Sequence, residues 1–192
     1  MADSGRARGE KRRGNGRLER FVELLGAYSA SVLTARLLEA VTTGEVTPAQ
    51  FEALTFIHRH GGCSAKALSE GLRISIPSST RLVDRLVRKA LVDRRESAED
   101  RRLVHLSLTA KGRTVLEDVR AARIARLQRA LGALSEEEQA LLHDLLERFL
   151  RGVLCDEETV QECCLHCGSE HDRDCVVNAV HEALVGRPIA CL

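Results

Sequence analysis

The stretch from residue 64 to residue 90 constrains the fold more than any other part of this 192-residue chain. Ser64 opens a run in which apolar residues recur at helical steps, and Gly71 marks its end. Ser75 and Pro77 open a second run, whose leucines and valines again recur every three or four residues. Serine caps helix N-termini and proline fits the first helical turn, so both helix starts are well marked. The pattern predicts two short helices joined by a turn.

A β-hairpin is predicted directly after these helices. Residues 91–95 and 103–108 are β-like runs, and the charged segment 96–102 separates them. Two short helices followed by a basic hairpin form the outline of a winged helix-turn-helix, whose second helix enters the DNA major groove. The predicted fold class is therefore mainly α with a small β-hairpin wing.

Longer helices are predicted on both sides of this module. Apolar residues recur at helical steps from about residue 17 to residue 40, and a further helix follows Thr47-Pro48. Thr109 can cap a long helix, and Ser135 begins a capping box for another. These helices contain more leucine than a small wing domain can bury, so the surplus predicts a homodimer interface formed by the N- and C-terminal helices.

The formal net charge of +1 hides an uneven distribution. Residues 64–113 contain twelve Lys or Arg against six Asp or Glu, whereas residues 155–192 contain two against eight. Lys and Arg that neutralise phosphates release condensed counterions, so the basic middle favours a polyanionic partner. We therefore expect double-stranded DNA to be the partner of residues 64–113.

The predicted domain organisation has three parts. Residues 1–16 are rich in Gly, Arg and Lys without apolar periodicity, which predicts a disordered basic arm. Residues 17–154 form the winged module with its dimerisation helices, and residues 155–192 are a cysteine-rich extension. We find neither a signal segment nor an apolar run long enough to span a membrane, so a cytoplasmic location is expected.

The N-terminal turn of the second short helix is the candidate DNA-reading surface. It places small hydroxyls and a guanidinium where a helix end faces phosphates and base edges, with further arginines at helical spacing. The candidates for the major groove are Ser78, Ser79, Thr80, Arg81 and Arg85. A solvated surface helix would have a similar composition, so the case depends on the hairpin that follows.

Three sequence stretches together resemble the MarR family of transcriptional regulators. They are Ala67-Leu68-Ser69 together with residues 79–92, the triplet Asp100-Arg101-Arg102, and residues 106–113. The similarity covers roughly residues 18–154. One departure is Ala90, where that family commonly has glycine before the first wing strand.

The resemblance implies roles for the wing residues. Asp100 would brace the wing by pairing with an arginine, Arg102 would reach into the minor groove, and Arg101 would be a second wing contact. The family's intertwined dimers imply two recognition helices that face half-sites about one DNA turn apart, and hence a near-palindromic operator.

The extension carries the most distinctive chemistry of the sequence. Cys155, Cys164, Cys167 and Cys175 form a C-x8-C-x2-C-x7-C string, an uneven spacing that iron–sulfur sites tolerate. The short Cys164–Cys167 loop lets two sulfurs converge on one ion, and Asp174 can cap a helix over 176–184. An iron–sulfur cluster is therefore the first expectation.

Two other interpretations of the extension remain open. Cys164, Cys167, His171 and Cys175 resemble a zinc knuckle whose last two gaps are each one residue short. Vicinal Cys163 and Cys164 could instead form a metal-free thiol switch. By contrast, Cys63 is expected to be a small buried residue in the turn between two helices.

The sequence predicts a DNA-binding regulator, and an enzyme is not expected. No nucleophile–base grouping or phosphate-binding glycine loop is found. The favoured hypothesis is a repressor whose operator binding is modulated by the cysteine centre, through movement of the helix over residues 135–154. The alternative is a repressor that responds to a small aromatic or organic effector, with the cysteines forming a structural zinc site.

Overall fold

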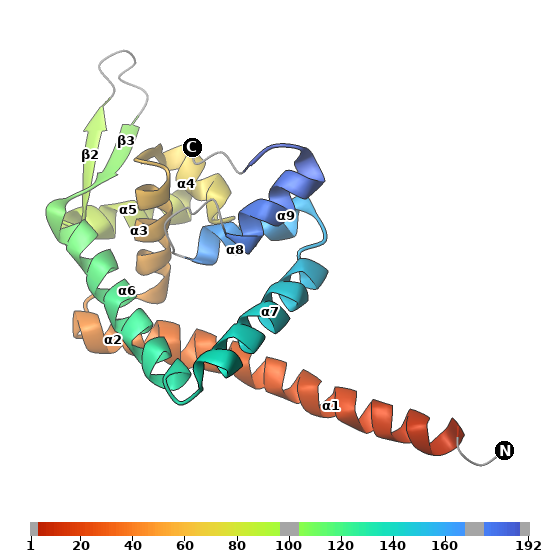
Figure 1. Cartoon of the computed structure of the whole chain (residues 1–192). Coiled ribbons are helices and arrows are strands. Elements are labelled where there is room, and N and C mark those ends of the chain that lie inside the picture. The colour runs from red at the N-terminus through yellow and green to blue at the C-terminus, as the bar shows by residue number, and fades with distance from the viewer. Residues whose placement is uncertain (1–3, 97–103, 168–174, 189–192) are drawn as a thin grey trace. The chain divides into compact units, whose positions relative to one another are not determined.

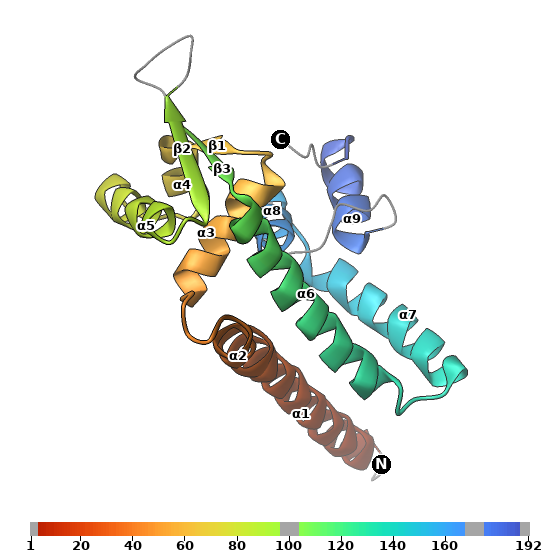
Figure 2. The same cartoon turned by 90° about the vertical axis from the view of Figure 1, so that its left-hand side faces the viewer.

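The structure is a computed structural model that describes residues 4–96, 104–167 and 175–188. The chain divides into two compact units, Met1–Pro48 and Ala49–Leu192, which are treated separately below. Figures 1 and 2 show the elements of each unit in two views. Helices dominate both units, and the described part of the chain contains one small sheet.

The first unit is an almost unbroken helical rod. It consists of α1 (Ser4–Tyr28), the π-helical segment η1 (Ser29–Arg36) and α2 (Leu37–Thr42). The helix predicted over residues 17–40 is thus confirmed. The structure also continues α1 through residues 4–16, where a disordered arm was expected. The Arg, Lys, Glu and Ala of this segment favour helix by intrinsic propensity, although its four glycines oppose it.

The same rod corrects one expectation about hydrophobic length. Its stretch Gly16–Thr42 is long and apolar enough to cross a membrane by length and composition alone, and little of it is buried in the single chain. The stretch also contains charged residues, which interrupt the apolar run in the sequence, but they lie mainly near its two ends. Helices in the core of a soluble protein have the same two properties, so length and composition do not assign it to a membrane.

The second unit contains the winged module and the extension. Its elements are α3 (Pro48–Arg59), β1 (Cys63–Ser64), α4 (Ala65–Gly71), α5 (Ile76–Arg88), β2 (Val92–Glu96), β3 (Val104–Leu108), α6 (Ala110–Leu131), α7 (Glu136–Val153), α8 (Glu157–Cys167) and α9 (Val176–Val185). The predicted short helices, hairpin strands and two long helices are all confirmed. Strand β1 and helix α8 were not predicted.

The N-caps predicted at Ser64, Thr109 and Ser135 are present. Ser64 Oγ accepts the N–H of Ala67 at 3.0 Å, and Thr109 Oγ1 accepts the N–H of Gly112 at 3.0 Å. The capping box closes in both directions, because Ser135 N–H donates to Glu138 Oε2 at 2.8 Å and Glu138 N–H donates to Ser135 Oγ at 3.2 Å. Each such cap stabilises its helix by about 1 kcal/mol. Because of this contribution, Ser and Thr are preferred at N-caps, so these helix starts could be predicted from the sequence.

The sheet is antiparallel with the order β1-β3-β2. Strand β3 is central: Leu108 pairs with Val92 of β2 in the hairpin, and Leu106 pairs with Cys63 of β1. Cys63 therefore lies in a strand instead of the expected turn, although its predicted burial is confirmed. Burial raises the pKa of its thiol to about 11.

Close packing brings the short helices together. Leu54, Leu68 and Leu86, from α3, α4 and α5, are all fully buried. Gly71 lies directly against the ring of Phe56, where any Cβ would overlap with it. The absence of a side chain at this position lets α4 pack closely against α3. Helix α5 packs on the surface that these two helices form.

Within its described residues, the extension forms the helices α8 and α9. Val160 of α8 and Val180 of α9 form a small buried cluster with Leu154, which follows α7. The helix predicted over residues 176–184 is confirmed as α9, but Cys175 is its N-cap residue and not part of its first turn. Asp174, the expected cap, lies outside the described residues.

Helix α7 exposes an apolar face in the single chain. Its exposed large side chains are Leu141, Leu145, Leu146, Phe149, Leu150 and Val153. In the other unit, α1 exposes Leu18, Phe21, Leu24 and Leu25. Soluble proteins rarely leave such surfaces uncovered, so each unit carries a face suited to a partner.

Candidate nucleic-acid interface

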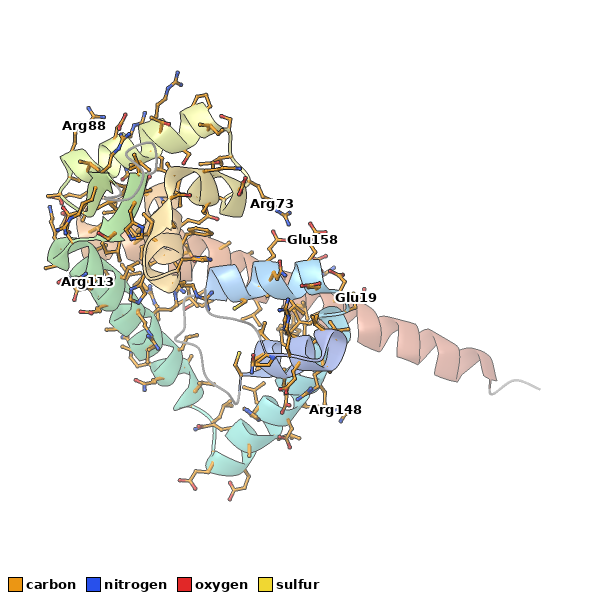
Figure 3. The ribbon with its side chains drawn as sticks, turned by 90° about the horizontal axis from the view of Figure 1, so that it is seen from above. Glu19, Arg73, Arg88, Arg113, Arg148 and Glu158 are labelled. Carbon is orange, nitrogen blue, oxygen red and sulfur yellow. The ribbon has the colours of Figure 1, made fainter. Side chains whose placement is uncertain are left out.

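Helix α5 has two faces of opposite character. Val83 and Leu86 are buried against the module, whereas Arg81, Arg85 and Arg88 are exposed. The three arginines follow one another at steps of four and three, so they lie along one side of the helix. Figure 3 shows Arg88 projecting outward from the end of α5. The helix therefore presents a row of guanidinium groups to its surroundings.

The first turn of α5 adds hydroxyl groups beside these arginines. Ser75 Oγ accepts the N–H of Ser78 at 3.3 Å and donates to Ser78 Oγ at 2.9 Å. Ser78 Oγ is the acceptor in this second bond, which leaves its own O–H able to donate to a phosphate. Thr80 Oγ1, also exposed, donates to the carbonyl of Ile76 at 3.0 Å.

Ser79 does not belong to this surface, contrary to expectation. Its side chain is only 1% exposed, and its Oγ donates to the carbonyl of Ala65 at 3.3 Å. Residues 79, 83 and 86 share the inner face of the helix, so Ser79 joins α5 to α4. The prediction considered the residue type without the helical phase, which turns this hydroxyl inward.

The wing is described at its base but not at its tip. Asp100, Arg101 and Arg102 lie outside the described residues, so their predicted roles stay predictions. Within β2, Arg94 Nη1 lies 3.6 Å from Asp84 Oδ1 of α5. This exposed ion pair links the recognition helix to the wing. No local spacing in the sequence signals a pair between a helix and a strand that follows it.

The end of α5 turns at Ala90, the position that departs from the family pattern. Ala90 has φ +56°, and Leu91 N–H donates to the carbonyl of Leu86 at 3.0 Å. This is the left-handed residue that closes a helix in a Schellman-type turn. Alanine occupies it at a cost of about 1 kcal/mol relative to glycine. The departure is thus tolerated without loss of the turn.

The run from Leu108 to Arg113 braces the base of the wing. Thr109 Oγ1 donates to the carbonyl of Ala90 at 2.7 Å, and Arg113 Nη1 donates to the carbonyl of Leu108 at 2.8 Å. Gly112 lies against the carbonyl of Leu91, where a Cβ would overlap. These motif residues are therefore structural, because they fix the orientation of the hairpin relative to α5.

The described cysteines of the extension lie in different surroundings. Cys155 is exposed and its Sγ lies 3.5 Å from Asp156 Oδ2, while Cys164 is half-buried with its Sγ 3.5 Å from Arg59 Nη2. Cys163 is exposed on α8, and Cys175 is half-buried at the start of α9. Among the side chains that the structure describes, no three Cys, His, Asp or Glu form a group that could hold a metal ion.

The remaining predicted ligands are only partly described. Cys167 is the last residue of α8, so the Cys164–Cys167 segment is helical where a loop was expected. The side chain of Cys167 and the whole of His171 lie outside the described residues. The predicted metal site is therefore untested at Cys167, which both ligand sets require, and at His171, which the zinc set requires.

The arrangement of α4, α5 and the hairpin defines a winged helix-turn-helix. The MarR family model matches residues 45–103. The HTH-type transcriptional repressor MdtR of Bacillus subtilis (strain 168) is 32% identical over 122 residues, which cover 64% of this chain and 79% of that protein. The chain therefore belongs to the MarR family.

Solved structures agree with this assignment. The crystal structure of the YusO protein from Bacillus subtilis matches with a TM-score of 0.61 and 28% identity, covering 72% of this chain and 98% of that one. Streptococcus pneumoniae FabT in complex with DNA shares the fold, with a TM-score of 0.59, 21% identity and coverage of 72% and 96%. The family consists of transcriptional regulators, which are not enzymes, as predicted for this chain.

Proposed function

We propose that this protein is a homodimeric transcriptional repressor that binds a near-palindromic operator in the cytoplasm. The observation that carries the proposal is the exposed row of Arg81, Arg85 and Arg88 on a helix whose opposite face is buried. A related protein, MdtR, is named a transcriptional repressor, and FabT was solved in complex with DNA. The name of MdtR supports repression, and the FabT complex supports DNA binding.

Each exposed group of α5 has a distinct task in this proposal. The planar guanidinium groups of Arg81 and Arg85 suit the paired acceptors of guanine in the major groove. Ser78 and Thr80 donate to phosphates and set the register of the helix. At the wing tip, Arg102 enters the minor groove, Arg101 makes a second contact and Asp100 braces the loop.

The exposed apolar faces of α1 and α7 support the homodimer. A second copy of this chain would cover them, and a two-fold axis would place the two α5 helices over half-sites about 34 Å apart. A near-palindromic operator follows from that symmetry.

The extension is the proposed regulatory part. An iron–sulfur cluster on Cys155, Cys164, Cys167 and Cys175 is the first candidate, and zinc with His171 in the ligand set is the second. The contact of Cys164 with Arg59 supports a role for the cysteines, because it connects α8 to helix α3 of the winged module. It also supports the metal-free alternative, since this sulfur lies beside a guanidinium. A small organic effector would leave the cysteines without a sensing role.

The DNA-binding part is tested by enrichment from a random duplex pool. The wild-type protein should enrich a near-palindrome, and the Arg81→Ala/Arg85→Ala variant should bind that sequence at least about tenfold more weakly. A matched control, Arg129→Ala/Arg187→Ala, removes the same charge from exposed positions outside α5. Equal losses in both variants, or no enrichment by the wild type, would refute the proposal.

The cofactor is tested on anaerobically purified protein. Iron and sulfide with a visible absorption band support the cluster, whereas stoichiometric zinc in colourless protein supports the second candidate. Protein without either metal, whose operator affinity changes on thiol oxidation and recovers on reduction, supports the thiol switch.

A further inference from the structure

Helix α8 of the extension touches the turn of the helix-turn-helix through an arginine. Arg73 Nη2 lies 2.7 Å from Glu158 Oε1, and Arg73 Nη1 lies 3.9 Å from Glu162 Oε2. The two carboxylates are one helical turn apart on α8, so one guanidinium reaches both. Figure 3 shows Arg73 extending from the end of α4 toward Glu158.

Arg73 occupies a particular place in the backbone. It follows the last turn of α4 with φ +50°, and the next residue, Ile74, donates its N–H to the carbonyl of Ser69 at 3.0 Å. This left-handed position favours glycine or asparagine. Two residues later, Ser75 caps the recognition helix α5. The guanidinium is therefore carried by the turn that leads into the DNA-reading helix.

The carboxylates that meet Arg73 are presented by an anchored helix. Val160, between them in sequence, is fully buried in the cluster with Leu154 and Val180. Asp156 fixes the start of α8, because its carboxylate accepts the N–H of Thr159 at 2.8 Å and the hydroxyl of Thr159 at 3.0 Å. These hydrogen bonds lower the pKa of Asp156. The acidic side of α8 thus faces the turn as part of a folded element.

In a helix-turn-helix the second helix enters the major groove and the first crosses the DNA backbone, so the turn that joins them is expected near phosphates. Backbone phosphates and carboxylates compete for the same guanidinium, because both accept its paired N–H donors in the same geometry. Arg73, Glu158 and Glu162 are 61%, 75% and 53% exposed. Exposed ion pairs of this kind are weak and screened by salt, so a phosphate can displace the carboxylates.

We propose that Glu158 and Glu162 form an acidic clasp that occupies Arg73 in competition with the DNA phosphate backbone. The clasp lets the extension lower the DNA affinity of the winged module, and a movement of α8 would release Arg73 as an additional phosphate contact. This inference rests on the DNA-binding function proposed above. It assigns the extension a direct effect on DNA affinity that requires no bound metal.

The test compares four forms of the full-length protein on a fluorescein-labelled 30-base-pair duplex of random sequence, because a phosphate contact is independent of sequence. Glu158→Gln/Glu162→Gln should tighten binding by roughly two- to tenfold at low salt. The slope of log affinity against log salt should also become steeper by up to about two, which corresponds to one additional phosphate contact per subunit of a dimer. Adding Arg73→Gln to this variant should remove both effects.

The matched control is Glu117→Gln/Glu182→Gln, which changes the net charge equally on exposed residues of α6 and α9. Circular dichroism and thermal melting verify that each variant is folded. The clasp is overturned if the control tightens binding equally, if the double variant binds like the wild type, or if the gain persists without Arg73. If no form binds the duplex, the DNA-binding proposal fails as well. Binding by the wild type with no gain in the variant overturns the clasp alone.

Discussion

The winged module and the C-terminal extension belong to one compact unit, yet they are held together by different means. The module is built on fully buried leucines from several helices and on tight backbone approaches at Gly71 and Gly112. The described part of the extension is held by a small apolar cluster, in which Val160 and Val180 pack with Leu154, and by exposed ion pairs. A region with a small core can open while its neighbour stays folded. The difference separates a rigid DNA-reading part from a part suited to regulation.

The largest expected effect comes from removing a side chain from each core. Leu86→Ala should lower the free energy of unfolding by about 2–5 kcal/mol, because it leaves a cavity between α5 and the module. Val160→Ala should act locally, with faster amide hydrogen exchange in α8 and unchanged exchange in α5. If Val160→Ala lowered the protection from exchange equally in both helices, module and extension would unfold as one. That result would contradict the difference between a rigid module and an extension that opens independently.

A smaller effect is expected where the backbone of the module is most tightly packed. Gly112→Ala should destabilise the protein by about 1–3 kcal/mol, because its Cβ would overlap with the carbonyl of Leu91. Gly152→Ala is the matched control, since a Cβ there meets nothing within 4 Å. Chemical denaturation measures both. A stabilising Gly112→Ala would contradict the bracing role of this turn.

Thiol reactivity offers a chemical form of the same comparison. Iodoacetamide at pH 8 should modify exposed Cys163 of the extension quickly and buried Cys63 of the module slowly, because the pKa of Cys63 is raised to about 11. The raised pKa also contributes stability that is complete below about pH 9 and lost as the pH rises toward 11.

Mass spectrometry with pH-dependent labelling measures the two thiol rates. Replacing Cys63 by Ala should flatten the fall in stability between these pH values. Similar labelling rates at the two cysteines would place Cys63 at the surface.

The smallest expected effect is an increase in stability. Ala90→Gly should raise the free energy of unfolding by about 1 kcal/mol, because glycine adopts the left-handed conformation without steric strain. Ala67→Gly, within helix α4, should have the opposite sign for the same residue change. Thermal melting distinguishes them, and a lower melting temperature for Ala90→Gly would mean that its methyl group contributes packing that outweighs the strain.

Most of the module could be predicted because its signals are local. Caps at Ser64, Ser75, Thr109 and Ser135 mark helix starts within a few residues, and the structure contains all four. Strand β1 could not be predicted in this way, since two residues become a strand only by pairing with β3 far along the chain. Ser79 was assigned to the wrong face although the phase of Val83 and Leu86 contained the needed information.

The extension could be predicted only in outline. Its cysteine spacing suggested a loop around Cys164, whereas the segment is part of α8, whose Val160 packs against Leu154, just after α7, and against α9. The ion pair of Arg73 with Glu158 joins residues 85 positions apart, and no local pattern announces it. The contact of Arg94 with Asp84 was missed for the same reason.

The joining of Arg73 and Glu158 within one polypeptide has a consequence for how such a regulator responds to its own abundance. The carboxylate is always close to the guanidinium, at an effective concentration on the order of millimolar or higher. Dilution or overproduction of the protein leaves this competition unchanged. DNA therefore competes with the same carboxylates at every level of expression, so the strength of this competition is set by the state of the extension and not by the abundance of the protein.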